Sequence, residues 1–210
     1  MSPPWHNRDV DHSESRPAGR PRDADADDRI IDAALAEYAA HGRAGYSLNG
    51  VARRAGVGKS SIYLRWRDKD TLLIDAVHAR TEVPTADTGT LAGDMKAIYA
   101  WLLEHFLTEA GWVAVRIAVD AAGAESAPAA PMTIGAQHAE SLRRMWERAT
   151  ERGEIPGPDD PQVRLVTRMM YGDLMLRVMV DRGRLLALDA DTRRTEAHFV
   201  VEMMLRMLRY

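Results

Sequence analysis

Three features of the sequence predict an all-α fold with two units, an N-terminal three-helix helix-turn-helix and a larger helical C-terminal domain. Apolar residues recur at three- and four-residue spacing from residue 30 to the C-terminus, which is the period of an α-helix. Short breaks rich in glycine, proline or aspartate divide this pattern into segments of helical length. No stretch rich in valine, isoleucine and threonine alternates with polar residues between hairpin turns, so we expect no β-sheet.

The composition is that of an ordinary globular chain, with 210 residues, 46% of them hydrophobic and 28% charged. There is no cysteine, which excludes disulfides, thiolate zinc sites and cysteine nucleophiles. No segment approaches the roughly 18 consecutive apolar residues of a membrane span. Residues 1–22 also lack the apolar stretch of a signal peptide. We therefore expect a soluble, cytoplasmic protein with no membrane partner.

The net charge of −3 conceals a strong segregation of charge along the chain. Residues 42–67 contain six basic residues and no aspartate or glutamate, a local field suited to phosphate groups. Residues 1–24 hold four prolines together with Arg16, Arg20 and Arg22, a composition typical of a disordered basic arm. Because its Gly-Arg-Pro-Arg sequence resembles the core of an AT-hook, the arm either reaches a minor groove or is simply disordered.

Residues 25–82 are expected to form the N-terminal domain, in which a further helix follows the helix-turn-helix. A glycine near the end of the first apolar stripe, Gly42, is expected to end the first helix. Ser47 is a suitable N-cap for the second helix, and Gly56 ends it. The predicted helices cover residues 30–42, 48–55, 59–66 and 69–81.

Residues 83–210 are expected to form the second domain, which begins with a hinge at residues 83–90. The helical pattern beyond the hinge is interrupted four times, which predicts five further helices. The interruptions are at Gly111 and at residues 128–131, 153–161 and 189–191. The last two predicted helices are residues 161–181 and 192–208.

The segment from residue 48 to residue 67 meets the geometric requirements of a helix-turn-helix. Ala52 is small where two helices would come closest, and Gly56 supplies the left-handed turn residue. The outer face of the third helix then carries Lys59, Ser60, Ser61, Tyr63, Leu64 and Arg67. The alternative is a purely structural helical hairpin, but the acid-free basic segment favours a DNA-binding domain. Arg53 and Arg54 are interpreted as a solvated basic face.

Residues 45–73 closely resemble the signature of the tetracycline-repressor (TetR) family of bacterial regulators, in the Ala-Gly-Val turn, the Ile-Tyr-x-x-Trp motif and Lys69. The resemblance implies a DNA-binding transcriptional regulator in which Tyr63, Lys69 and Ser47 hold phosphates. Residues of the first turn of the third helix, with Asn49, would then read bases. The candidate DNA-binding residues are Ser47, Asn49, Lys59, Ser60, Ser61, Tyr63, Leu64, Arg65, Arg67 and Lys69.

The second domain contains ten of the eleven methionines and several aromatic residues, which can either shape an apolar ligand cavity or form ordinary core. The resemblance implies a cavity. Its candidate lining residues are Met95, Ile98, Trp101, Phe106, Met132, His138, Met145, Met170 and Met175. Apolar residues of the last two helices are expected either to form a four-helix dimer interface or to pack within their own domain. These residues are Val163, Val166, Met170, Leu174, Phe199, Met203 and Leu208.

Catalytic motifs are absent from the sequence, and His78, His105 and His138 are scattered over different predicted helices. We therefore expect no enzymatic activity, no metal site and no cofactor. The leading hypothesis is a repressor that binds a palindromic double-stranded DNA operator as a homodimer through its last two helices and is released by a small apolar ligand. The alternatives are a ligand-independent regulator, an activator, or a helical enzyme or carrier with an incidental helix-turn-helix.

Overall fold

The computed structural model describes residues 24–122 and 130–208, and within these ranges it contains helices and no strand. The all-α prediction is therefore confirmed. The helices are α1 (Ala24–Gly45), α2 (Leu48–Ala55), α3 (Lys59–Tyr63), α4 (Lys69–Ala79), α5 (Leu91–Leu107), α6 (Glu109–Ala122), α7 (Ala130–Glu151), α8 (Pro161–Ala187) and α9 (Ala190–Met207).

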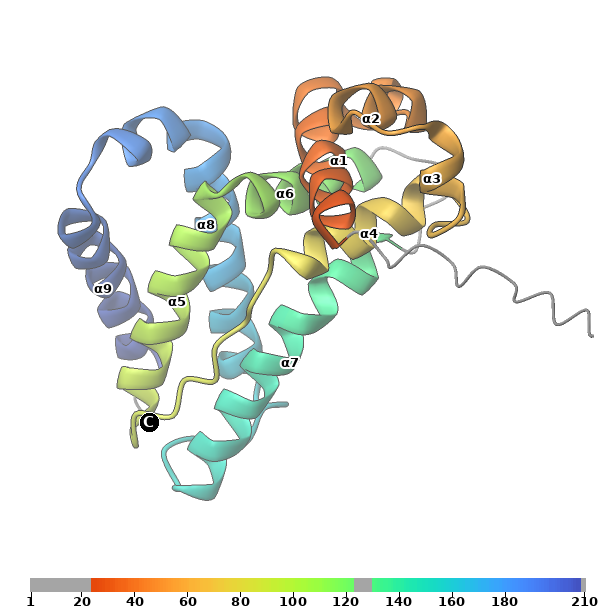
Figure 1. Cartoon of the computed structure of the whole chain (residues 1–210). Coiled ribbons are helices and arrows are strands. Elements are labelled where there is room, and N and C mark those ends of the chain that lie inside the picture. Colours follow the sequence, from red (N-terminus) through yellow and green to blue (C-terminus); the bar gives the residue numbers. More distant parts are fainter. Residues whose placement is uncertain (1–23, 123–129, 209–210) are drawn as a thin grey trace, which may run out of the picture.

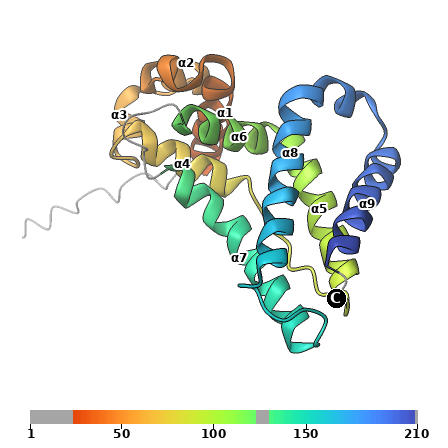
Figure 2. The same ribbon diagram turned by 180° about the vertical axis from the view of Figure 1, so that it is seen from behind.

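The helices form two groups, joined by α6 and by the segment between α4 and α5. Figure 1 shows α1 to α4 gathered at one end of the molecule and α5, α8 and α9 running side by side at the other. The view from behind in Figure 2 shows the same division, with α7 extending from α4 along the second group. In both views α3 lies at the outer end of the first group, far from α9.

The N-terminal group has its own apolar core, and this core includes one face of α6. Ile30, Val51, Ile62 and Leu72 are completely or almost completely buried at its centre. The residues that α6 contributes to it are Ala110, Val113, Ala114 and Ile117. Helix α6 packs against both α1 and α4, so a helix from beyond the hinge completes the core of the N-terminal group.

A polar seam holds α6 to the C-terminal half of α1. The hydroxyl of Tyr38 donates to Oδ2 of Asp120 at 2.9 Å, and the backbone N–H of Arg43 donates to the same oxygen at 3.2 Å. The guanidinium of Arg116 donates to the carbonyl oxygen of Ala39. At Gly42, where φ is 61°, a Cβ would lie 2.6 Å from an Arg116 nitrogen. Glycine therefore permits both the kink that ends regular α1 and the approach of α6.

The C-terminal core is formed mainly by α5, α7, α8 and α9. Met95, Met145, Met170 and Leu174 are fully buried in it. One polar pair crosses this core: the hydroxyl of Tyr99 on α5 donates to Asp173 on α8. Such pairing offsets the free energy lost when polar groups leave water.

Asp94 is a fully buried acid that fixes the start of α5. Its carboxylate accepts from the backbone N–H of Thr88 at 2.6 Å and pairs with Arg152 at 3.2 Å. The end of the inter-domain segment, the first turn of α5 and the chain after α7 are therefore held at one point.

The structure has most of the predicted breaks, but several helix bounds differ. The first helix begins at Ala24 rather than at residue 30, and the helix predicted for residues 161–181 continues to Ala187. Helix α3 is shorter than predicted because the chain tightens after Tyr63, with the N–H of Arg65 donating to the carbonyl of Ile62 at 3.0 Å. The predicted break at Gly111 is wrong, since α5 ends before Thr108 and Gly111 lies inside α6. The predicted break at residues 128–131 falls largely outside the described residues.

Gly111 is required by a close approach rather than by a turn. A Cβ at this position would lie well inside contact distance of the carbonyl oxygen of His105 and the Cα of Phe106. Both are backbone atoms, which cannot move aside as a flexible side chain can. The glycine lets α6 begin directly against the end of α5.

Gly111→Ala is expected to lower the free energy of unfolding, because overpacking against backbone costs about 1–3 kcal/mol. For a chain of this size each kcal/mol lowers Tm by roughly 2–4 °C. Gly157→Ala is the matched control, since a Cβ at Gly157 meets nothing within 4 Å. Thermal unfolding followed by circular dichroism measures both variants. Equal Tm values for the two would contradict the assigned close approach.

Candidate nucleic-acid interface

Both ends of α2 are fixed by local interactions that the sequence predicts. The Ser47 hydroxyl accepts from the backbone N–H of Gly50 at 3.1 Å, as an N-cap does. Gly56 has φ 67° and ψ 33°, the left-handed conformation of a helix C-cap. The N–H of Val57 then donates to the carbonyl of Ala52 at 3.1 Å and turns the chain toward α3.

The inner faces of α2 and α3 are anchored by buried apolar residues. Val51 and Ile62 are fully buried, and Ala52 is buried at the crossing. Trp66, just after α3, is also buried, and its indole Nε1–H donates to Oδ2 of Asp75 on α4 at 2.9 Å. This bond and the apolar contacts orient α3 relative to α4.

A buried carboxylate, which sequence reasoning missed, holds α2 against α1. Glu37 on α1 is only 3% exposed, and Arg54 on α2 pairs with it at 3.3 Å. Its carboxylate lies over Gly50, where any Cβ would collide with it. Arg54 is exposed, as expected for a solvated face, and it also ties α2 to α1 through this pair. The sequence feature that could have indicated this close contact is Gly50, the single glycine inside α2.

The predicted outer face is presented to solvent. Tyr63 is 52% exposed and Leu64 is 83% exposed, although both are large side chains with apolar parts. The other exposed members of the predicted set are Asn49, Lys59, Ser60, Arg65 and Arg67, and those half-buried are Ser47, Ser61 and Lys69. An exposed apolar side chain beside hydroxyl and ammonium groups is suited to a DNA groove, where thymine methyls and phosphates are adjacent.

The basic segment is less uniformly positive in three dimensions than along the chain. Arg65 pairs with Asp27 of α1, and Arg67 pairs with Asp68 at 3.0 Å. Lys69 donates to the carbonyl of Tyr46 at 3.3 Å. Lys59 lies 5.6 Å from the centre of the Tyr63 ring and, among the described residues, has no ion-pair partner. Lys59 is therefore the cation of α3 that remains available to an anion. Arg16, Arg20 and Arg22 lie outside the described residues.

Most of the candidate ligand-binding residues are packed in the C-terminal core. Met95, Ile98, Phe106, Met145 and Met170 are buried there, and Trp101 and Met175 are half-buried against it. The side chain of Met132 lies outside the described residues. The structure brings three of the candidates together, since the rings of Trp101 and Phe106 each lie within 6 Å of the ring of His138.

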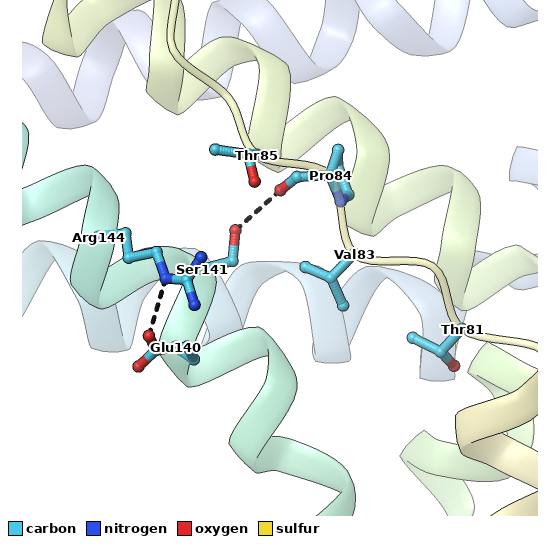
Figure 3. A pocket seen from close by; sticks show the side chains of 7 residues that line it. All are labelled: Thr81, Val83, Pro84, Thr85, Glu140, Ser141 and Arg144. Carbon is cyan, nitrogen blue, oxygen red and sulfur yellow. Dashed lines mark hydrogen bonds and ion pairs between the residues drawn. The ribbon is translucent and has the colours of Figure 1, made fainter.

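A shallow hollow of about 270 Å³ lies where the hinge passes α7 (Figure 3). Figure 3 shows Ser141 and Arg144 of α7 on one side and the chain from Thr81 to Thr85 on the other. The Ser141 hydroxyl donates to the carbonyl of Pro84 at 3.0 Å, and Arg148 donates to the carbonyl of Ala86. The hinge is thus attached to α7 by side-chain hydrogen bonds.

No group of three histidine, aspartate or glutamate side chains in residues 24–122 and 130–208 is arranged to hold a metal ion. Within the same ranges, no helix combines the length and apolar character needed to cross a bilayer.

Comparisons with known proteins assign the chain to a family. Residues 30–76 match the model described as "Bacterial regulatory proteins, tetR family", and residues 85–209 match "Tetracyclin repressor-like, C-terminal domain". The chain belongs to the TetR family. TetR-family proteins are transcriptional regulators that bind DNA and are not enzymes.

Relatives of this TetR-family chain cover most of its length. It is 30% identical over 161 residues to the HTH-type transcriptional regulator AqdR of Rhodococcus erythropolis, covering 76% of this chain and 77% of that protein. It is 25% identical over 166 residues to the uncharacterized HTH-type transcriptional regulator YdeS of Bacillus subtilis, covering 77% of this chain and 82% of YdeS.

Solved structures share the fold of this TetR-family chain at lower identity. A TetR-family regulator from Mesorhizobium loti matches with a TM-score of 0.62 at 22% identity, covering 89% of this chain and 98% of its own. FadR from Bacillus subtilis, solved in complex with stearoyl-CoA, matches with a TM-score of 0.62 at 18% identity, covering 82% of this chain and 96% of its own.

Asp68 caps α4 and so helps to position Lys69. Its carboxylate accepts from the backbone N–H of Thr71 at 2.8 Å, and this bond, with those from the Thr71 hydroxyl and Arg67, lowers the pKa of Asp68 to about 2. A carboxyl whose pKa is lower in the folded state stabilises the fold above its ordinary pKa near 4. That stability is lost as the pH falls toward about 2.

Asp68→Ala is expected to destabilise the protein at pH 7 by about 1 kcal/mol, the usual effect of losing an N-cap. The difference from the wild type should shrink as the pH falls from 4 toward 2, because the native carboxyl is then protonated as well. Denaturant unfolding across this pH range measures the change. Asp159→Ala, in the exposed segment before α8, is the control. A pH-independent deficit in Asp68→Ala would contradict the capping role.

Proposed function

We propose that this TetR-family protein is a repressor that binds a palindromic operator as a homodimer and is released from it by a small apolar ligand. The observation that carries the DNA-binding face is the exposure of Tyr63 and Leu64 on α3 beside Lys59, for which the described residues provide no ion-pair partner. A soluble chain gains nothing from two large exposed side chains at this position unless a partner covers them.

Within this proposal the residues of the face divide into two kinds. Tyr63, Lys69 and the Ser47 end of α2 hold phosphates, since a phenol, an ammonium group and a helix N-terminus satisfy phosphate oxygens without reading sequence. Lys59, Ser60 and Ser61 read base edges from the start of α3, with Asn49 beside them. Leu64 contacts thymine methyl groups. Arg65 and Arg67 add positive charge at the rim, reduced by their pairing with Asp27 and Asp68.

A dimer through α8 and α9 is supported by an exposed apolar stripe. The α8 residues that spacing suggested, Val163, Val166, Met170 and Leu174, are fully buried in their own core, so they cannot form the interface. Of the α9 candidates, Phe199 is 64% exposed, Met203 is half-buried and Leu208 is buried. Other residues of α8 form the stripe instead, namely Leu165, Met169, Leu176, Met179, Val180 and Leu186.

Two glycines on the same side of α8 suit a close contact between helices. Gly172 and Gly183 follow Leu165 by seven and eighteen residues, which are whole turns of a helix. A Cβ on either would meet nothing within 4 Å. Helix axes can approach more closely where side chains are small, so a symmetry-related α8 could pack along this stripe.

Release by a ligand requires that the C-terminal core control the spacing of the two α3 helices. A dimer engages two half-sites only when its reading helices are about 34 Å apart, or a multiple of that distance. Helix α4 leads from the reading unit to the hinge, and α6 packs directly on α1. A ligand that changes the packing of α5 and α7 would therefore move α4 and α6, and with them α3. The acyl-CoA bound by the FadR neighbour supports an apolar ligand.

Tyr63→Ala and Lys69→Ala are expected to weaken binding to all duplexes similarly, whereas Lys59→Ala changes which sequences are preferred. Loss of the Lys69 phosphate contact should reduce the slope of log affinity against log salt by about one. Fluorescence anisotropy with duplexes selected from genomic DNA by the wild-type protein measures both effects. Lys96→Ala, on α5, is the matched lysine control. Unchanged affinity and slope in Lys69→Ala would show that the proposed face is wrong.

Val180→Asp is expected to convert the dimer to a monomer, because it places a charge in the middle of the apolar stripe at a residue that is 70% exposed in one chain. Val119→Asp, at a position of α6 that is 42% exposed, is the control with the same chemical change. Light scattering coupled to gel filtration gives the mass of each variant. A dimeric Val180→Asp protein would exclude this stripe as the interface, and a monomeric wild type would exclude the homodimer.

A further inference from the structure

Three histidines from three helices have buried ring nitrogens that lack a hydrogen-bond partner among the described residues. They are His78 on α4, His105 on α5 and His138 on α7, and in each the unsatisfied atom is Nε2. His105 is 6% exposed and His138 is 5% exposed. A buried polar atom left unpaired destabilises the fold, so natural structures keep few of them outside functional sites. His78, His105 and His138 are scattered in the sequence, but each has a buried Nε2 that lacks a partner among the described residues.

Aromatic rings lie against His105 and His138. The ring of Trp101 stacks on that of His105 at 4.9 Å with an interplanar angle of 4°. The ring of His138 lies 5.4 Å from that of His105 and 5.7 Å from that of Phe106, in both cases edge to face. Trp101 also borders a hollow of about 300 Å³ between α5 and α9. His105 and His138 thus lie among the rings of Trp101 and Phe106, and it is Trp101, rather than either histidine, that lines this hollow.

His105 and His138 are uncharged at neutral pH. Burial lowers the pKa of His105 to about 4. Burial, followed by the nearby His105 and His78, lowers the pKa of His138 to about 4. No described carboxylate contributes to either shift. A neutral imidazole can donate or accept through Nε2 according to its tautomer. The site therefore offers both donors and acceptors but no negative charge for a cation.

We propose that His78, His105 and His138 bind the acidic group of an aromatic effector, a molecule with a flat apolar body and one carboxyl or acidic hydroxyl group. This proposal rests on the proposed release by a ligand and specifies its chemistry. An acidic hydroxyl of the effector donates to Nε2 of one histidine while its oxygen accepts an Nε2–H from another. A carboxyl group, which is ionised at neutral pH, either takes up one proton from solvent on binding and does the same, or accepts an Nε2–H from two histidines. The rings of Trp101 and Phe106 pack against the aromatic body.

The position of the cluster connects the effector to the reading unit. His78 lies in the last turn of α4, which runs from the N-terminal group to the hinge. His138 lies on α7, whose next residues include Ser141, the partner of Pro84 in the hinge. A hydrogen bond from the effector to either histidine therefore acts on the segment that joins the two units. An effector that draws α4 and α7 toward α5 would change the separation of the two α3 helices in a dimer.

The chemical test uses pairs of compounds that differ only in the acidic proton. The probes are 1-naphthoic acid, 2-naphthoic acid and 2-naphthol, each with its methyl ester or methyl ether. We expect at least one acid to raise the Tm of the full chain and to weaken binding to the selected operator duplex at least tenfold more than its methyl partner. The proposal is overturned if no acid exceeds its methyl partner.

The second test uses variants, and its first readout, the Tm, needs no effector. His105→Leu and His138→Leu replace an unpaired imidazole by an apolar side chain of similar size, so their Tm should rise by roughly 2–4 °C or more. They should also lose the preference for acids while binding operator as the wild type does. His198→Leu, a half-buried position on α9, is the control that should show neither effect. His138→Gln keeps a hydrogen-bonding group and should retain part of the preference.

The outcomes separate this inference from the proposed function. If methyl esters or ethers release the operator as well as the acids do, ligand release stands and the histidine assignment fails. If no compound of either kind weakens operator binding, both the assignment and ligand release are rejected for this class of molecule. A lower Tm in both leucine variants would indicate that the histidines are structural, and would overturn the inference even if acids bind.

Discussion

The packing of α6 against α1 and α4 is the contact on which the relation between the two halves of the molecule depends. Val113 and Ile117 of α6 lie in the same core as Ile30 and Val51. The N-terminal helices therefore cannot bury their apolar surface fully without a helix from beyond the hinge. Because apolar burial is the main source of stability, the orientation of α3 relative to the C-terminal core is fixed by packing as well as by the chain connection.

Polar interactions then determine which arrangement the packing adopts. Tyr38, Arg43 and Arg116 hold α6 to α1, and Ser141 and Arg148 hold the hinge to α7. Apolar contacts tolerate sliding, whereas hydrogen bonds between buried or half-buried groups require one geometry. The hinge is thus attached to α7, and the N-terminal group is attached to α6. A change in the position of α7 is therefore transmitted to the segment that follows α4.

On α8 and on α3, some apolar residues are buried and stabilise the fold, whereas others are exposed and available to a partner. On α8, Val166 and Met170 are fully buried while Leu176 and Val180 are exposed, although all four are apolar and lie on one helix. On α3, Ile62 is fully buried while the adjacent Tyr63 and Leu64 are exposed. In both helices the inner residues secure the position of the outer ones, so that a rigid element presents the exposed face.

Local sequence determined the elements of this protein. Helical periodicity, the Ser47 cap and the Gly56 turn act over a few residues, so the all-α fold, the helix-turn-helix and the family could be predicted from sequence alone. Interactions between distant segments were decided only by tertiary structure. They placed Gly111 inside a helix, paired Arg54 with Glu37, buried the α8 residues expected at an interface, and gathered His78, His105 and His138 from three helices. Sequence spacing describes which residues share a face of one helix, but the packing of helices determines what that face meets.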